Sequence, residues 1–101
     1  MVPHCLQELP VVERLYRKFD PEIRFIGVAV WEPAHKTRAV VNRLGLTFPI
    51  LLDKNNSVSR LYDVKAVPAN FLLGPRGVVR KRIQRALRGE RLERLLKGLL
   101  G

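Results

Sequence analysis

Apolar residues recur every three or four positions at both ends of the chain, which is the spacing of one face of a helix. The N-terminal stripe consists of Leu6, Leu9, Val12, Leu15 and Phe19. The C-terminal stripe consists of Leu92, Leu95, Leu96 and Leu99. Both stretches are therefore predicted to be amphipathic helices, and charged residues such as Glu8 and Glu13 are expected on the polar side of the first.

Between these helices the pattern changes to that of strands. Residues 23–31 are almost continuously apolar and β-branched, which is typical of a strand buried on both faces in a parallel sheet. Residues 48–52 form a shorter extended segment. Residues 70–73 and 78–83 flank a Gly-Pro-Arg-Gly turn, and this arrangement predicts a β-hairpin.

Two further helices are predicted between the strands. One begins at Glu32-Pro33 and ends at Gly45, a natural C-terminal cap. A short one follows the turn at residues 53–57. The order is helix, strand, helix, extended segment, helix, hairpin, helix, which is an α/β pattern. With 101 residues, the chain has room for one domain, which we expect to span residues 1–101.

The formal net charge of +10 is concentrated toward the C-terminus. Nine basic residues are opposed there by Glu90 and Glu93: Arg76, Arg80, Lys81, Arg82, Arg85, Arg88, Arg91, Arg94 and Lys97. Such a segment attracts nucleic acid, anionic lipid or an acidic protein, or it simply forms a solvated surface. The few aromatic residues do not interleave with the basic ones as stacking platforms would, which argues against nucleic acid.

Cys5 is the single cysteine of the chain. It therefore has no partner for an intramolecular disulfide, and a cysteine-based zinc cluster is excluded. A reactive thiol remains open, and so does a small buried apolar side chain.

Two segments together resemble a known family. Residues 3–10 (PHCLQELP) resemble the end of the Trp-Cys-Pro-x-Cys-x-x-Glu-x-Pro signature of thioredoxin-like thiol–disulfide oxidoreductases, closest to the TlpA-like branch and its AhpC/TSA-redoxin relatives. Residues 67–77 (VPANFLLGPRG) resemble that family's Val-Pro-x-x-Phe-Leu-Ile-Asp-x-x-Gly segment. The resemblance implies a thioredoxin-like fold, with three α/β/α layers around a mixed sheet.

The resemblance also implies roles for individual residues. Cys5 takes the place of the second, resolving cysteine of the CxxC motif, and Val2 stands where the first, nucleophilic cysteine would be. Pro3 and His4 occupy the variable pair that tunes the thiols. The Val67-Pro68 bond is expected to be cis, in a loop where the backbone docks an extended substrate.

The chain departs from the family at its start. The family's strand before the motif lies at the centre of the sheet, and the sequence has no equivalent of it. We therefore expect a fold that lacks the N-terminal central strand, and we interpret the chain as N-terminally truncated relative to the family. The edges of the two neighbouring strands would then lack their usual partner.

The function implied is reduction of protein disulfides, although one thiol is not expected to sustain turnover. The alternatives are a non-catalytic binding module and a one-cysteine peroxiredoxin-like peroxidase. Protein thiols and disulfides are the expected partners, together with a homodimer through Cys5 or an exposed sheet edge. No cofactor or metal is implied. A membrane is an expected partner only if an anchor lies upstream. Without a signal, the chain as given is expected to be cytoplasmic; a natural start further upstream would allow an extracytoplasmic or membrane-tethered protein.

Overall fold

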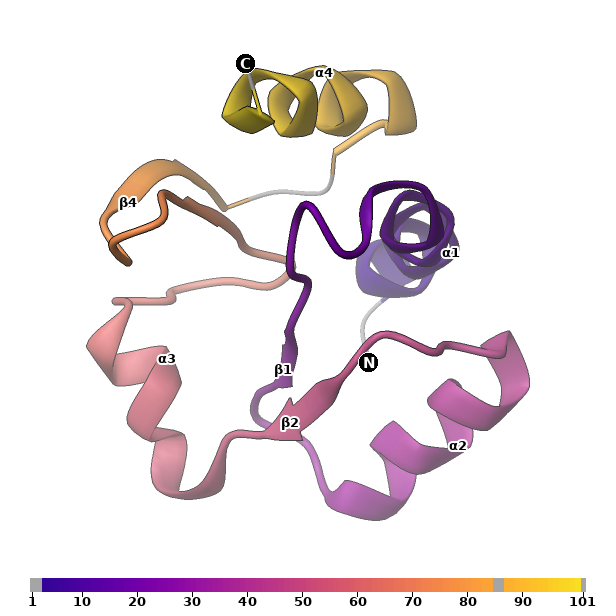
Figure 1. The fold of residues 1–101 in the computed structure, drawn as a ribbon. Coiled ribbons are helices and arrows are strands. Elements are labelled where there is room, and N and C mark those ends of the chain that lie inside the picture. The colour runs from indigo at the N-terminus through magenta and orange to yellow at the C-terminus, as the bar shows by residue number, and fades with distance from the viewer. Residues whose placement is uncertain (1–2, 85–86, 101) are drawn as a thin grey trace.

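The computed structural model describes the backbone of residues 3–84 and 87–100, and within these ranges the side chains from residue 7 onward. The order of helices and strands is the predicted one (Figure 1). The elements are α1 (Pro3–Phe19), β1 (Gly27–Ala29), α2 (Ala34–Leu44), β2 (Ile50–Leu52), the 3-10 turn η1 (Lys54–Asn56), α3 (Ser57–Leu61), β3 (Asn70–Leu73), β4 (Val79–Ile83) and α4 (Gly89–Leu100).

Local residue chemistry explains where the central helices begin and end. Pro33 is the N-cap of α2, and Gly45 ends this helix in the left-handed conformation at φ 66°, which glycine adopts without strain. The carboxylate of Asp53 accepts hydrogen bonds from the backbone N–H groups of Val58 and Ser59 at 2.8 and 2.9 Å. This carboxylate fixes the first turn of α3, as a capping residue does.

Within residues 3–84 and 87–100, four strands form two separate two-stranded sheets (Figure 1). Strands β1 and β2 are parallel, with Gly27 opposite Ile50, and β3 and β4 are antiparallel, with Asn70 opposite Ile83. Within the described residues no strand joins β1 to β3. This arrangement agrees with the predicted α/β fold that lacks its central strand.

Strand β1 is much shorter than predicted. The sequence indicated a strand over residues 23–31 that is buried on both faces, but only Gly27–Ala29 are paired and Ile26 is 65% exposed. The reason is that, among the residues that the structure describes, β1 has a neighbour on one edge alone, and that neighbour, β2, is three residues long. An apolar run indicates burial, but the length of a strand depends on its partner.

The core forms where α1 and α4 pack on one face of the β3–β4 hairpin. Its buried members are Leu15, Phe19, Leu72, Ile83, Leu87, Leu92 and Leu96. On the other face of the hairpin, Tyr62 at the end of α3 contacts Phe71 edge to face, with ring centroids 5.0 Å apart. Helices α1 and α4 thus cover one face of the hairpin, and Tyr62, the residue after α3, covers part of the other face, in line with a three-layer α/β/α arrangement.

Glu8 and Glu13 do not lie on the solvent side of α1, where the sequence pattern placed them. Both residues are 7% exposed. Glu13 accepts hydrogen bonds from the backbone N–H of Thr47 at 2.7 Å and from Arg17 Nε at 2.6 Å. Burial opposes the ionisation of Glu13, but the hydrogen bonds from Thr47 and Arg17 outweigh it and lower the pKa of this carboxyl. The carboxylate thereby ties α1 to the loop that leads into β2.

Candidate functional site

The motif that carries the single cysteine lies at the start of α1. The backbone of Pro3, His4 and Cys5 forms the first turn of this helix, while the side chains of these residues lie outside the described part of the structure. Val2 lies outside the described residues altogether. The free N–H groups and the positive end of the dipole make the first turn of a helix a place that favours a thiolate over a thiol.

The second predicted site element is the loop before β3. The Val67-Pro68 peptide bond is cis, as the sequence predicts. Both residues are half-buried, and Asn70, two positions further on, begins β3. The role of Val67 and Pro68 in docking a substrate stays a prediction.

Glu8 connects these two elements. It lies one helical turn after Cys5, and its carboxylate accepts hydrogen bonds from Asn70 Nδ2 at 3.1 and 3.3 Å and from the backbone N–H of Leu87 at 2.7 Å. A buried carboxylate is stable only when it is satisfied in this way. Glu8 therefore joins the cysteine-bearing turn both to the strand that follows Pro68 and to the segment that precedes α4.

Glu8 is the site residue that the sequence analysis passed over. Its carboxylate lies within the Cys-x-x-Glu-x-Pro part of the motif, on a turn of α1 that also carries the partly buried Leu9. The signal available in the sequence was an acidic residue at a fixed offset from Cys5. The spacing of apolar residues along the predicted helix instead placed Glu8 on its polar face.

Glu32 lies in the short segment between β1 and α2. It is half-buried and accepts a hydrogen bond from Thr37 Oγ1 in the first turns of α2. Burial opposes the ionisation of Glu32, but this hydrogen bond helps to lower the pKa of the carboxyl. These contacts support a structural role for Glu32 at the start of α2.

The described part of the chain holds neither a candidate metal site nor a membrane-spanning helix. No three His, Cys, Asp or Glu side chains come together there as a metal ion would require. None of the helices described is long and apolar enough to cross a bilayer.

Comparison with known sequences identifies relatives along most of the chain. The model of the AhpC/TSA family matches residues 1–82. The thiol-disulfide oxidoreductase ResA of Geobacillus kaustophilus is 31% identical over 96 residues, which cover 94% of this chain and 55% of ResA. ResA of Geobacillus thermodenitrificans is 30% identical over 96 residues, which again cover 94% of this chain and 55% of that ResA. The chain thus spans about half the length of the curated relatives it matches.

Solved structures resemble the fold of this chain. The structure of MTB dsbF in its mixed oxidized and reduced forms superimposes with a TM-score of 0.89 at 29% identity, over 97% of this chain and 72% of that one. A putative thiol:disulfide interchange protein DsbE from Chlorobium tepidum gives a TM-score of 0.88 at 22% identity, over 99% and 73%. The fold is therefore thioredoxin-like, as the two sequence motifs imply.

Proposed function

Because the chain belongs to the AhpC/TSA family and to its TlpA-like branch, we propose that it is a thiol–disulfide oxidoreductase whose exchange chemistry rests on Cys5. The observation that carries this proposal is the link that Glu8 makes between the first turn of α1 and β3, the strand that follows cis-Pro68. In this arrangement the thiol-bearing turn and the proposed docking loop are held by one carboxylate. The relatives described above are named for the same chemistry.

The exchange step follows from having one thiol. The Cys5 thiolate attacks one sulfur of a substrate disulfide, a new S–S bond forms to that sulfur, and the other substrate sulfur leaves as a thiolate. Val2 supplies no second thiol to resolve this mixed disulfide. The reaction therefore stops at one equivalent per chain unless an external low-molecular-weight thiol releases the product.

Substrate docking is the second part of the proposal. The backbone of Val67, just before cis-Pro68, pairs with an extended segment of the protein substrate by strand addition. Pro3 and His4, the residues before Cys5 in the motif, tune the reactivity of the thiol. The half-burial of Val67 and Pro68 leaves part of this loop open to such a partner.

The architecture of the sheet is the third part. A strand placed between β1 and β3 would turn the two small sheets into one mixed sheet, at the position of the family's first strand. The separation of the two sheets supports this arrangement. It also accounts for Ile26 being exposed beside β1.

The proposal is tested by the exchange of Cys5 with an aromatic disulfide that releases a coloured thiolate. The folded chain should release one equivalent and gain the mass of one adduct, and it should react faster than the same chain in urea. The unfolded chain is an internal control because Cys5 is its single thiol. Cys5→Ser should release nothing. Equal rates for the folded and unfolded chains would show that the fold does not activate the thiol and would refute the proposal.

A further inference from the structure

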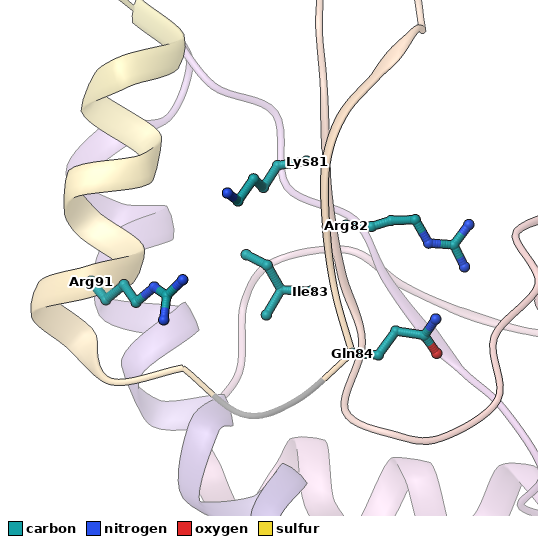
Figure 2. A pocket seen from close by; sticks show the side chains of 5 residues that line it. All are labelled: Lys81, Arg82, Ile83, Gln84 and Arg91. Carbon is teal, nitrogen blue, oxygen red and sulfur yellow. The ribbon is translucent and has the colours of Figure 1, made fainter.

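A groove of about 300 Å³ lies between β4 and α4 (Figure 2). Lys81 and Ile83 point from β4 toward α4, and Arg91 points toward them from α4, while Arg82 and Gln84 point to the opposite side of the strand. Ile83 is buried, whereas Lys81 and Arg91 are exposed, so the groove has an apolar floor and two cationic side chains at its mouth. Its size is at the small end of ligand-binding clefts and leaves room for a side chain of a partner.

The charges of Lys81 and Arg91 are not balanced within the groove. The lining includes no acidic residue, and Glu93 on α4 is engaged by Lys18 at 2.8 Å and by Lys97 at 3.2 Å. In the described part of the chain, the side chains of Lys81 and Arg91 take part in no ion pair or hydrogen bond. Two like charges that face one groove repel each other, and an anion between them relieves this repulsion. The groove therefore favours a negatively charged group.

Arg82, which follows Lys81 in β4, has a structural role instead. Its guanidinium donates hydrogen bonds to the carbonyl oxygens of Tyr62 and Asp63 at 2.9 and 3.0 Å. Arg82 therefore holds the hairpin to the end of α3. Because the side chain of Lys81 makes no such bonds among the described residues, its charge is available to a partner.

The groove lies next to the proposed exchange site. Ile83, on its floor, is the ladder partner of Asn70, which begins β3 two positions after cis-Pro68. Asn70 also binds Glu8, in the helical turn that follows the cysteine. Lys81 lies two residues from Ile83 in β4, which is about 7 Å along the strand. An extended substrate covers this distance in about two residues, so a peptide held at the loop of cis-Pro68 can place a nearby side chain in the groove.

We propose that the β4–α4 groove binds an acidic side chain of the protein substrate, and that Lys81 and Arg91 select substrates whose exchanged cysteine has Asp or Glu within a few residues. This inference rests on the proposed exchange at Cys5 and names the class of its substrate. A carboxylate complements the two cations, and the formal net charge of +10 steers an acidic protein toward the chain. A nucleic acid fits less well, because no residue that lines the groove is an aromatic that could stack on a base.

The test measures how fast Cys5 of the full 101-residue chain exchanges with two peptides. Each peptide carries one cysteine as a mixed disulfide with an aromatic thiol, and the second peptide has glutamine wherever the first has glutamate. The Cys5 thiolate attacks the peptide sulfur, a new S–S bond joins the peptide to the chain, and the aromatic thiolate leaves. Each rate is divided by that of a neutral free thiol with the same peptide. At low salt the glutamate peptide should react about tenfold faster, and the difference should shrink at high salt.

Two double variants of equal charge make the result specific. Lys81→Gln/Arg91→Gln should remove most of the preference for the glutamate peptide. Arg24→Gln/Arg43→Gln removes the same charge from exposed positions before β1 and in the last turn of α2, and it should keep the preference. Equal losses in the two double variants would mean that net charge alone attracts the peptide, and would overturn the proposal. So would a single-stranded oligonucleotide of equal charge that competes with the glutamate peptide better than a cysteine-free version of that peptide does.

A small neutral disulfide separates this inference from the exchange on which it rests, because it carries no charge for the groove to bind. The ratio of the glutamate-peptide rate to the small-disulfide rate should fall in Lys81→Gln/Arg91→Gln and stay unchanged in the control variant. If the small disulfide reacts but the two peptides do not differ, the inference is overturned while exchange at Cys5 stands. If the folded chain reacts with the small disulfide no faster than the unfolded chain, the exchange itself is refuted, and this inference with it.

Discussion

Glu8 accepts a hydrogen bond from the backbone N–H of Leu87 at 2.7 Å, across 79 positions of the chain. Both residues are buried, so the bond forms where water cannot replace it. The same carboxylate binds Asn70 at the start of β3. One acidic side chain in the turn after Cys5 thus connects the two halves of the proposed site.

Glu8→Ala should destabilise the chain by about 1–3 kcal/mol, because it leaves the Leu87 N–H buried without a partner. Glu8→Gln keeps an acceptor oxygen and should therefore lose clearly less stability than Glu8→Ala. Urea unfolding measures both, with Glu22→Ala at an exposed position as the control. If Glu8 positions the thiol, Glu8→Ala should also slow the exchange of Cys5 in the folded chain and Glu8→Gln should restore it. Similar stabilities of Glu8→Ala and the control would contradict this account.

Glu13 should make the stability of the chain depend on acid pH. Because its pKa is lowered in the folded state by the bonds from Thr47 and Arg17, its contribution is complete above the ordinary pKa of about 4.5. This contribution to stability is lost as the pH falls through the lowered pKa of Glu13. The difference in unfolding free energy between the wild type and Glu13→Gln should therefore be constant above about pH 5 and shrink below pH 4.5. A difference that grows on acidification would contradict a lowered pKa for Glu13.

Leu15 tests the packing of α1 against the hairpin. It is fully buried in the core beside Leu72 and Ile83. Leu15→Ala should cost about 2–5 kcal/mol through lost contacts and the cavity left behind. Leu61 is 80% exposed, and Leu61→Ala should change stability by less than about 0.5 kcal/mol. Chemical denaturation of the two variants should separate them by several times the error of the measurement.

The free edge of β1 should be visible in amide hydrogen exchange. The Gly27 N–H donates to Pro49 O at 2.8 Å and so points to β2, and the alternation of a strand turns the Val28 N–H the other way. Toward that side the described residues provide no strand. Val28 should therefore exchange much faster than Gly27. Protection of Val28 that increases with protein concentration would instead indicate a second copy paired at this edge, as in the homodimer that the sequence favoured.

The sequence predicted the order of the elements because each has a local cause. Gly45 ends α2 by its left-handed conformation, and the Gly-Pro-Arg-Gly turn joins β3 to β4. The extent of β1 could not be predicted in this way, because pairing depends on a partner elsewhere in the chain. The burial of Glu8 was missed for a similar reason. Its hydrogen-bond donors, Asn70 and Leu87, lie more than 60 positions away, and periodicity within one helix cannot reveal them.

The central claim is that the fold supports thiol–disulfide exchange at the start of α1 and lacks a second thiol for turnover. The most direct measurement is the catalysed reduction of insulin disulfides with an excess of a dithiol reductant, for the wild type, Val2→Cys and Gln7→Cys. Gln7→Cys adds a thiol to the same helix at an exposed position outside the CxxC spacing. With circular dichroism confirming that all three are folded, the account predicts fast turnover for Val2→Cys and much slower turnover for the other two, because their mixed disulfides must wait for the external dithiol. Turnover by the wild type as fast as that of Val2→Cys, or a folded Val2→Cys that is no faster than the wild type, would contradict it.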